Sequence, residues 1–205
     1  MEITAEKIMQ QLSAGTQVAG VIAVFGEEGY YKDKIAAALP RAVFGDAAPE
    51  DREITVFERD TDIKEISAAV NTYPFFSGRS LVIIKDEKLW GGKDGGEKRK
   101  QQQEELAELL ADVPEHCQVL LLGEKIDKRG KLYKSLLKTA AMVECKSLKS
   151  YQLKPWLDEQ AALRGCRFDY EASQTIMEYL SVTDNAPLLL LEQEIEKLSV
   201  YAGER

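Results

Sequence analysis

Residues 62–84, DIKEISAAVNTYPFFSGRSLVII, contain the change of pattern that decides the fold. Apolar residues first recur at the i, i+3 and i+7 spacing of one helix face, at Ile63, Ile66 and Val70. Asp62 is a suitable cap for the start of that helix. The stretch ends in a continuous apolar run, residues 81–84, which is typical of a strand buried on both faces of a parallel sheet. The sequence therefore predicts a helix that leads through a short loop into a central strand.

Two adjacent phenylalanines, Phe75 and Phe76, lie between this helix and this strand. Pro74 disfavours the α conformation at Tyr73, and Gly78 marks the exit of the loop, so both rings fall outside either regular pattern. Burial of both rings in the local core is one interpretation. It is weakened because neighbouring side chains in a turn point in different directions. Exposed rings would each offer roughly 150–250 Å², which makes the pair a candidate anchor for a partner.

The alternation of helix and strand patterns extends over residues 18–145. Apolar runs predict strands at residues 18–25, 54–57, 81–84, 117–122 and 142–145. Amphipathic patterns predict helices at residues 1–17, at 30–39 with Pro40 ending it, from 62, and at 97–112 and 131–137. Strands that alternate with helices indicate a three-layer α/β domain with a mainly parallel sheet.

After residue 145 the strand signal fades. Three further helices are predicted, at residues 153–163, 170–180 and 187–201. The last has an apolar stripe formed by Leu188, Leu191, Ile195 and Leu198. We therefore expect an α/β domain over residues 1–148 and a small all-helical domain over residues 149–205.

A glycine turn follows the first predicted central strand, at the place where phosphate-binding loops occur. The working pattern is G-x-x-x-x-G-K-[ST], in which backbone N–H groups surround the phosphates. Here the turn is Gly26-Glu27-Glu28-Gly29, which is too short and has no Lys-Ser or Lys-Thr pair after a glycine. Glu27 and Glu28 would repel a triphosphate, and residues 123–125 supply no acidic pair for magnesium. We expect a degenerate, non-functional phosphate loop; an active ATPase is the alternative.

The charge balance and the histidine and cysteine content argue against DNA binding by the chain alone, a catalytic triad and a metal site. With 27 basic and 35 acidic residues the net charge is −8, which disfavours tight autonomous binding to DNA. Basic clusters at residues 98–100, 125–134 and 146–154 leave contact with nucleic acid inside an assembly open. The single histidine excludes a His-based catalytic triad, and the three cysteines form no Cys-x-x-Cys motif. We therefore expect no catalytic residues and no metal site.

The apolar runs, the N-terminal residues and the cysteines of the sequence indicate the cellular compartment. No apolar run approaches the ~20 residues of a membrane span, and the first residues lack the basic region and apolar core of a signal peptide. Widely spaced cysteines are typical of structural thiols in a reducing compartment. A cytoplasmic protein without membrane contact is expected.

Four segments together resemble the delta subunit family of bacterial DNA polymerase III, the clamp-loader family. They are residues 24–31, residues 73–84, residues 119–122 with 131–134, and residues 184–185 with 188–198. The resemblance implies an AAA+-like α/β domain of the P-loop type, a helical lid and a C-terminal collar. Since the chain stops at Arg205, we expect the collar, which joins delta to the other loader subunits, to be absent.

The resemblance also implies a mechanism without catalysis. In the family a hydrophobic pair at a helix end inserts into a pocket of the ring-shaped sliding clamp, the beta subunit. The matching positions are Phe75 and Phe76, with Tyr73 and Pro74 beside them. Binding would favour the open form of one clamp interface, for loading on primed DNA within the assembled complex. Partner subunits would bind ATP, so this non-catalytic subunit of the polymerase needs no cofactor. An active AAA+ ATPase and a nucleic-acid-binding protein are the alternatives.

Overall fold

The computed structural model describes residues 1–16, 18–58, 61–85, 96–181 and 188–203. The chain divides into two compact units, Met1–Lys146 and Ser147–Arg205. The first contains the strands β1 Glu2–Ile3, β2 Val21–Phe25, β3 Glu53–Phe57, β4 Ser80–Ile84, β5 Cys117–Gly123 and β6 Ala140–Glu144. Its helices are α1 Ala5–Ser13, α2 Gly29–Phe44, the 3₁₀ turn η1 Pro49–Asp51, α3 Ile63–Asn71, α5 Gly96–Leu109 and α6 Lys131–Thr139.

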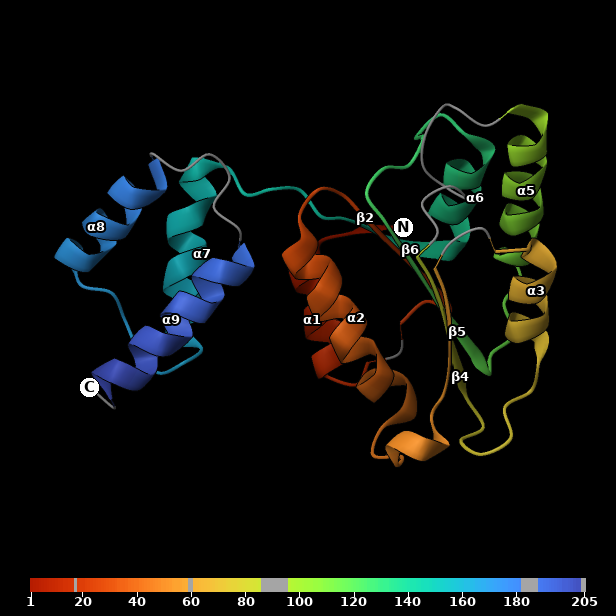
Figure 1. Cartoon of the computed structure of the whole chain (residues 1–205), viewed down its shortest axis with the longest axis horizontal. Helices are drawn as coiled ribbons and strands as arrows, with labels where there is room; N and C mark the ends of the chain where they lie inside the picture. Colours follow the sequence, from red (N-terminus) through yellow and green to blue (C-terminus); the bar gives the residue numbers. More distant parts are fainter. Residues whose placement is uncertain (17, 59–60, 86–95, 182–187, 204–205) are drawn as a thin grey trace. The chain divides into compact units, whose positions relative to one another are not determined.

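The six strands form one sheet in the order β1-β6-β2-β5-β4-β3, and every pair is parallel. Helices α1 and α2 cover one face, and α3, α5 and α6 cover the other (Figure 1). Strands β2 and β4 are buried along their whole length, as their continuous apolar sequences require. The predicted three-layer α/β fold with a parallel sheet is confirmed.

Helix α3 shows how the decisive stretch folds. The Asp62 side chain accepts a hydrogen bond from the Lys64 backbone N–H at 3.0 Å and so caps the helix. The three apolar residues of the predicted face are all buried, namely Ile63, Ile66 and Val70. They pack into a cluster with β4 residues such as Val82 and Ile84. Burial of this one face against the sheet sets the position at which the chain leaves α3.

Two predicted helices have bounds that are wrong by four or more residues. Residues 1–17 are not one helix, because Glu2–Ile3 pairs in parallel with Met142 and Val143 of β6 before α1 begins. The N-terminal ammonium group also donates to the Leu137 and Ala140 carbonyls at 2.8 and 2.7 Å. These contacts with a distant strand override the local pattern.

Pro40 does not end α2. The helix continues to Phe44 with Pro40 inside it. Proline removes one backbone N–H donor from a helix, but Leu39, Val43 and Phe44 are buried around it. Burial of these side chains holds the final turns of the helix in place.

The second unit consists of α7 Ser150–Ala162, α8 Tyr170–Ser181 and α9 Leu188–Ala202. Its buried apolar residues come from all three helices: Trp156, Leu157, Ala161, Leu180, Leu188 and Ile195. Of the predicted α9 stripe, Leu198 is half exposed. The predicted positions 184, 185 and 187 lie outside the described residues. Whether this unit is a lid domain remains a prediction.

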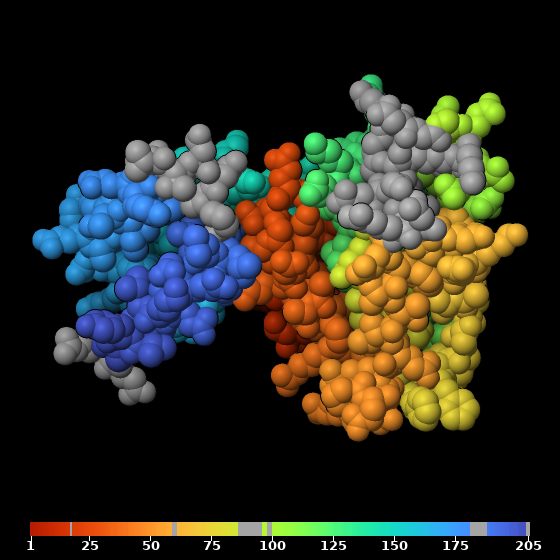
Figure 2. All heavy atoms as spheres, in the orientation of Figure 1, coloured from red at the N-terminus to blue at the C-terminus, as the bar shows by residue number. Residues whose placement is uncertain are grey.

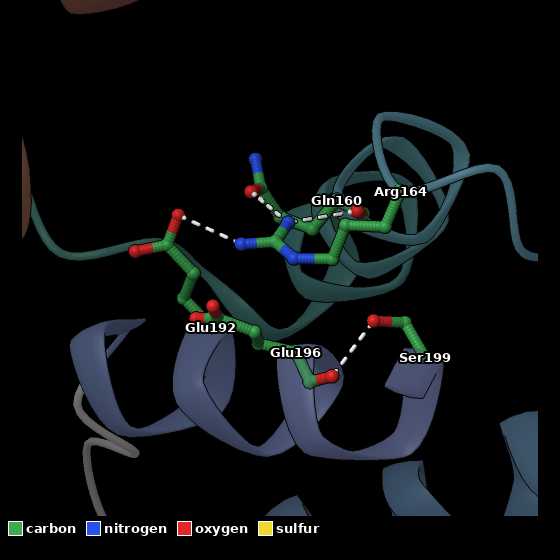
Figure 3. A network of polar contacts seen from close by, with 5 residues as sticks. All are labelled: Gln160, Arg164, Glu192, Glu196 and Ser199. Carbon is green, nitrogen blue, oxygen red and sulfur yellow. Dashed lines mark hydrogen bonds and ion pairs between the residues drawn. The ribbon is translucent and has the colours of Figure 1, made fainter. Parts of the chain in front are cut away.

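A polar contact joins the turn that follows α7 to α9 (Figure 3). The Arg164 guanidinium donates to the Glu192 carboxylate at 3.1 Å, and the two side chains are only 20% and 11% exposed. The other terminal nitrogen of Arg164 donates to the Gln160 carbonyl and side-chain oxygen, at 2.9 and 3.2 Å. This partly buried pair fixes the end of α7 against α9. Within the described part of the chain, no helix combines the length and apolar character that crossing a membrane requires.

Candidate functional site

The loop between α3 and β4, residues 72–79, lies in the yellow lower-right region of Figure 2 and contains Phe75 and Phe76. The exposed fractions of Phe75 and Phe76 are 87% and 67%. Their ring centroids are 5.0 Å apart in an edge-to-face arrangement. The interpretation that both rings pack inside the core therefore does not describe this fold. The two rings form one exposed apolar surface, which we call the aromatic pair.

The two residues before the aromatic pair differ in exposure. Tyr73 is 72% exposed, and its ring centroid lies 5.1 Å from that of His116. Pro74 is buried. Of the four residues that the sequence singles out here, Pro74 therefore shapes the loop from inside, and the other three supply the accessible surface.

The carboxylate of Glu53 holds the middle of the loop. Its Oε1 accepts hydrogen bonds from the backbone N–H groups of Phe75 and Phe76, at 2.6 and 3.1 Å. Glu53 is the first residue of β3 and pairs in register with Ser80 of β4. Sequence reasoning missed it, because it lies 22 residues before Phe75 and only the pairing of β3 with β4 brings them together.

The two ends of the loop are also fixed. On the α3 side, the Thr72 backbone N–H and hydroxyl both donate to the Ala68 carbonyl, at 3.0 and 2.7 Å. On the β4 side, the Ser77 hydroxyl donates to the Arg79 carbonyl at 2.7 Å. Gly78 has φ of 65°, in the left-handed region that favours glycine. The aromatic pair is thus displayed on a loop held at its start, its middle and its end.

The glycine turn is closed by the chain's own backbone. Gly26 has φ of 133°, and the Glu28 N–H donates to the Cys145 carbonyl at 3.1 Å. The Glu28 carboxylate accepts the Tyr30 N–H at 3.0 Å and so caps α2. The Lys32 ammonium group donates to the Gly26 carbonyl at 2.9 Å. The Lys32 ammonium group and the N–H groups of Glu28 and Tyr30 are therefore bonded to acceptors within the protein.

The glycine turn and the loop with the aromatic pair lie at opposite ends of the parallel strands. The glycine turn follows β2 and so lies at the carboxyl end of the parallel strands, whereas the loop that carries the aromatic pair precedes β4 and lies at the amino end (Figure 1). All strands are parallel, so the structure does not bring the two together.

Several lysines of the predicted basic clusters are ion-paired. The pairs are Lys128 with Glu144 at 2.8 Å, Lys131 with Glu104 at 2.6 Å, Lys146 with Glu144 at 3.1 Å and Lys154 with Asp158 at 2.7 Å. The side chains of residues 98 and 99 lie outside the described residues. Neutralisation by neighbouring carboxylates lowers the local positive potential that a nucleic-acid surface would need.

Two thiols are buried, those of Cys117 and Cys145. Burial raises the pKa of Cys145 to about 12, although the Lys32 charge opposes the shift. Burial also raises the pKa of Cys117. These thiols belong to the core, and among the described residues no three His, Cys, Asp or Glu side chains lie together as a metal site would require.

These features define a class: a three-layer α/β protein with a parallel sheet, a closed glycine turn and an exposed aromatic pair. A family model described as DNA polymerase III, delta subunit, matches residues 25–146, and the chain belongs to this family. The resemblance seen in the sequence is confirmed.

Two relatives support the assignment. Over 192 residues the chain is 28% identical to DNA polymerase III subunit delta of Bacillus subtilis (strain 168), covering 92% of this chain and 54% of the relative. The solved structure of the Bacillus subtilis DNA clamp loader delta protein (YqeN) matches with a TM-score of 0.75 and 26% identity, covering 98% of this chain and 58% of that one. The chain thus spans little more than half the length of either relative.

Proposed function

We propose that the chain acts in DNA replication as a clamp-loader delta subunit that grips the sliding clamp through Phe75 and Phe76. The observation that carries this proposal is the exposure of both rings on an anchored loop. Isolated exposed aromatic residues are common, but an adjacent pair held by backbone hydrogen bonds suits insertion into a partner's pocket.

The energy available is sufficient for an anchor. Two rings of roughly 150–250 Å² each, at about 25 cal/mol per Å², set an upper bound of roughly 7–12 kcal/mol. Loss of translational freedom and ordering of side chains reduce this figure. Because the loop is already held in place, the share lost to ordering it is reduced.

Clamp opening follows from differential affinity. A ligand shifts an equilibrium between two states only by the difference in its affinity for them. We propose that the aromatic pair binds the open form of one clamp interface more tightly than the closed form. No hydrolysis by this chain is needed for that shift.

We further propose that the chain does not hydrolyse ATP. The closed glycine turn supports this, because Lys32 and the N–H groups of Glu28 and Tyr30 are engaged within the protein. ATP would then be bound by other clamp-loader subunits. Those subunits would join the whole protein through a further domain, and primed DNA would enter the assembled complex.

The decisive experiment measures affinity for the source organism's sliding clamp by surface plasmon resonance. Phe75→Ala with Phe76→Ala should weaken binding at least about 100-fold, since central aromatic anchors can each contribute 2 kcal/mol or more. A matched control replaces two exposed aromatic residues of the second unit, Tyr151 and Tyr201, with alanine. Unchanged affinity in the phenylalanine variant would refute the proposal.

The ATPase alternative has its own test. Titration with a fluorescent ATP analogue should give no saturable signal with this chain. Saturable binding that is lost on mutation of the glycine turn would favour the ATPase instead.

A further inference from the structure

One carboxylate oxygen of Glu53 accepts hydrogen bonds from the consecutive backbone N–H groups of Phe75 and Phe76. Both hydrogen bonds, at 2.6 and 3.1 Å, end on the same carboxylate oxygen. Hydrogen bonds to an ionised acceptor are shorter and stronger than those between neutral groups. With both N–H groups directed at one point, the peptide planes of Phe75 and Phe76 have little freedom to rotate. The direction of each Cα–Cβ bond, from which the ring extends, follows from the orientation of those planes.

Glu53, which holds the loop, belongs to a strand of the sheet. Glu53 begins β3, which is an edge strand, and its register partner Ser80 begins β4. The Ser80 N–H in turn donates to the His116 carbonyl at 2.8 Å, next to β5. The carboxylate and the strand that receives the loop are therefore parts of the same rigid element. A site supported in this way holds its geometry better than one supported by loops alone.

We propose that Glu53 is a positioning residue, which holds the aromatic pair in its binding conformation before the clamp arrives. This inference rests on the proposed function, and it adds a residue that need not touch the partner. When a partner binds only one loop conformation, its apparent dissociation constant equals the intrinsic one divided by the fraction of molecules in that conformation. Glu53 keeps this population high in the free protein.

The test separates positioning from direct contact by measuring the free protein first. In Glu53→Ala, amide hydrogen exchange at Phe75 and Phe76, followed by NMR on the whole chain, should rise close to the rate of an unprotected amide, because the held conformation becomes the minor one. If the population of the held conformation drops to about one tenth, the dissociation constant for the clamp should rise about tenfold.

Two further variants serve as controls. Glu53→Gln keeps a side-chain oxygen that can accept both N–H groups but removes its negative charge, so exchange and affinity should lie between those of the original protein and those of Glu53→Ala. Glu50→Ala removes an exposed carboxylate three positions away and should change neither quantity. Circular dichroism confirms that each variant is folded.

The outcomes are distinguishable. Unchanged exchange at both amides in Glu53→Ala overturns the inference, even if clamp affinity falls, because Glu53 would then act by direct contact. Exchange near the rate of an unprotected amide with unchanged affinity overturns it as well. If the phenylalanine double variant binds the clamp normally, the proposed function fails instead, whatever the exchange rates show.

Discussion

The backbone of Cys145 runs so close to Gly26 that a Cβ atom added at Gly26 would lie 2.0 Å from the Cys145 carbonyl oxygen. That carbonyl accepts the Glu28 N–H, and the Cys145 N–H donates to the Phe25 carbonyl at 2.7 Å. The segment after β6 therefore occupies the space beside the glycine turn, and the turn has no room for a side chain at this position.

Gly26→Ala should destabilise the fold by at least about 2 kcal/mol, because it combines a strained backbone with a backbone clash. Gly29→Ala is the matched control, since a Cβ there meets no atom within 4 Å and the residue starts α2. The control should be neutral or slightly stabilising. Urea denaturation followed by circular dichroism measures both. Equal stabilities for the two variants would mean that the close approach at Gly26 does not exist in solution.

Much of the fold could be predicted from local patterns. The helix face at Ile63, Ile66 and Val70 and the apolar run of β4 were both identified correctly, because each side chain's burial follows from its own segment's period. The two-residue strand β1 could not be found this way. It exists only because β6, far along the chain, offers it a pairing edge.

The same distinction applies to the candidate site. Adjacent phenylalanines flanked by Pro74 and Gly78 mark an irregular loop in the sequence, so the aromatic pair could be proposed. Nothing in the sequence connects that loop to Glu53, because the contact depends on the register of β3 against β4. Likewise, the sequence shows that the glycine turn lacks a working pattern, but only the fold shows that Cys145 closes it.

Pro40→Ala should stabilise the protein by about 1 kcal/mol. The alanine restores a backbone donor for the Ala36 carbonyl and improves helix propensity, while the unfolded chain gains some entropy that offsets part of the benefit. The melting temperature from thermal denaturation measures this gain in stability. A lower melting temperature would show that α2 depends on the proline's shape for packing around Leu39 and Val43.

Arg164→Ala should destabilise the second unit by about 2 kcal/mol, since the poorly exposed Glu192 carboxylate loses the guanidinium that faces it. Arg164→Lys keeps the charge but loses the forked geometry, so an intermediate loss is expected. Trp156 is buried in α7 and reports unfolding of this unit by fluorescence, in a Trp90→Phe background.

The control for this pair is Lys154→Ala. It removes an ion pair between i and i+4 on α7, whose side chains are about half exposed. Pairs of this kind contribute at most about 0.5 kcal/mol. If Arg164→Ala cost no more than Lys154→Ala, the partly buried pair would not stabilise the unit.

Cys145 should make stability depend on alkaline pH. The thiol ionises near pH 8.5 in an unfolded chain, as model thiols do, but its pKa is raised to about 12 in the fold because it is buried. Between these values the unfolded state releases a proton that the folded state retains, so stability is fully present below about pH 8.5 and is lost as pH rises toward 12. The loss approaches about 1.4 kcal/mol per pH unit.

Other groups titrate in the same range, so the difference between the original protein and Cys145→Ala isolates this thiol. Urea denaturation at pH 8, 9 and 10 should show the original protein's advantage shrinking at the higher pH values, because alanine has no proton to release. The half-buried Cys166 should react with iodoacetamide at pH 8 under native conditions, and the buried Cys117 and Cys145 only after unfolding. A constant difference from pH 8 to 10, together with native labelling of Cys145, would show that its thiol ionises as freely in the fold as in the unfolded chain.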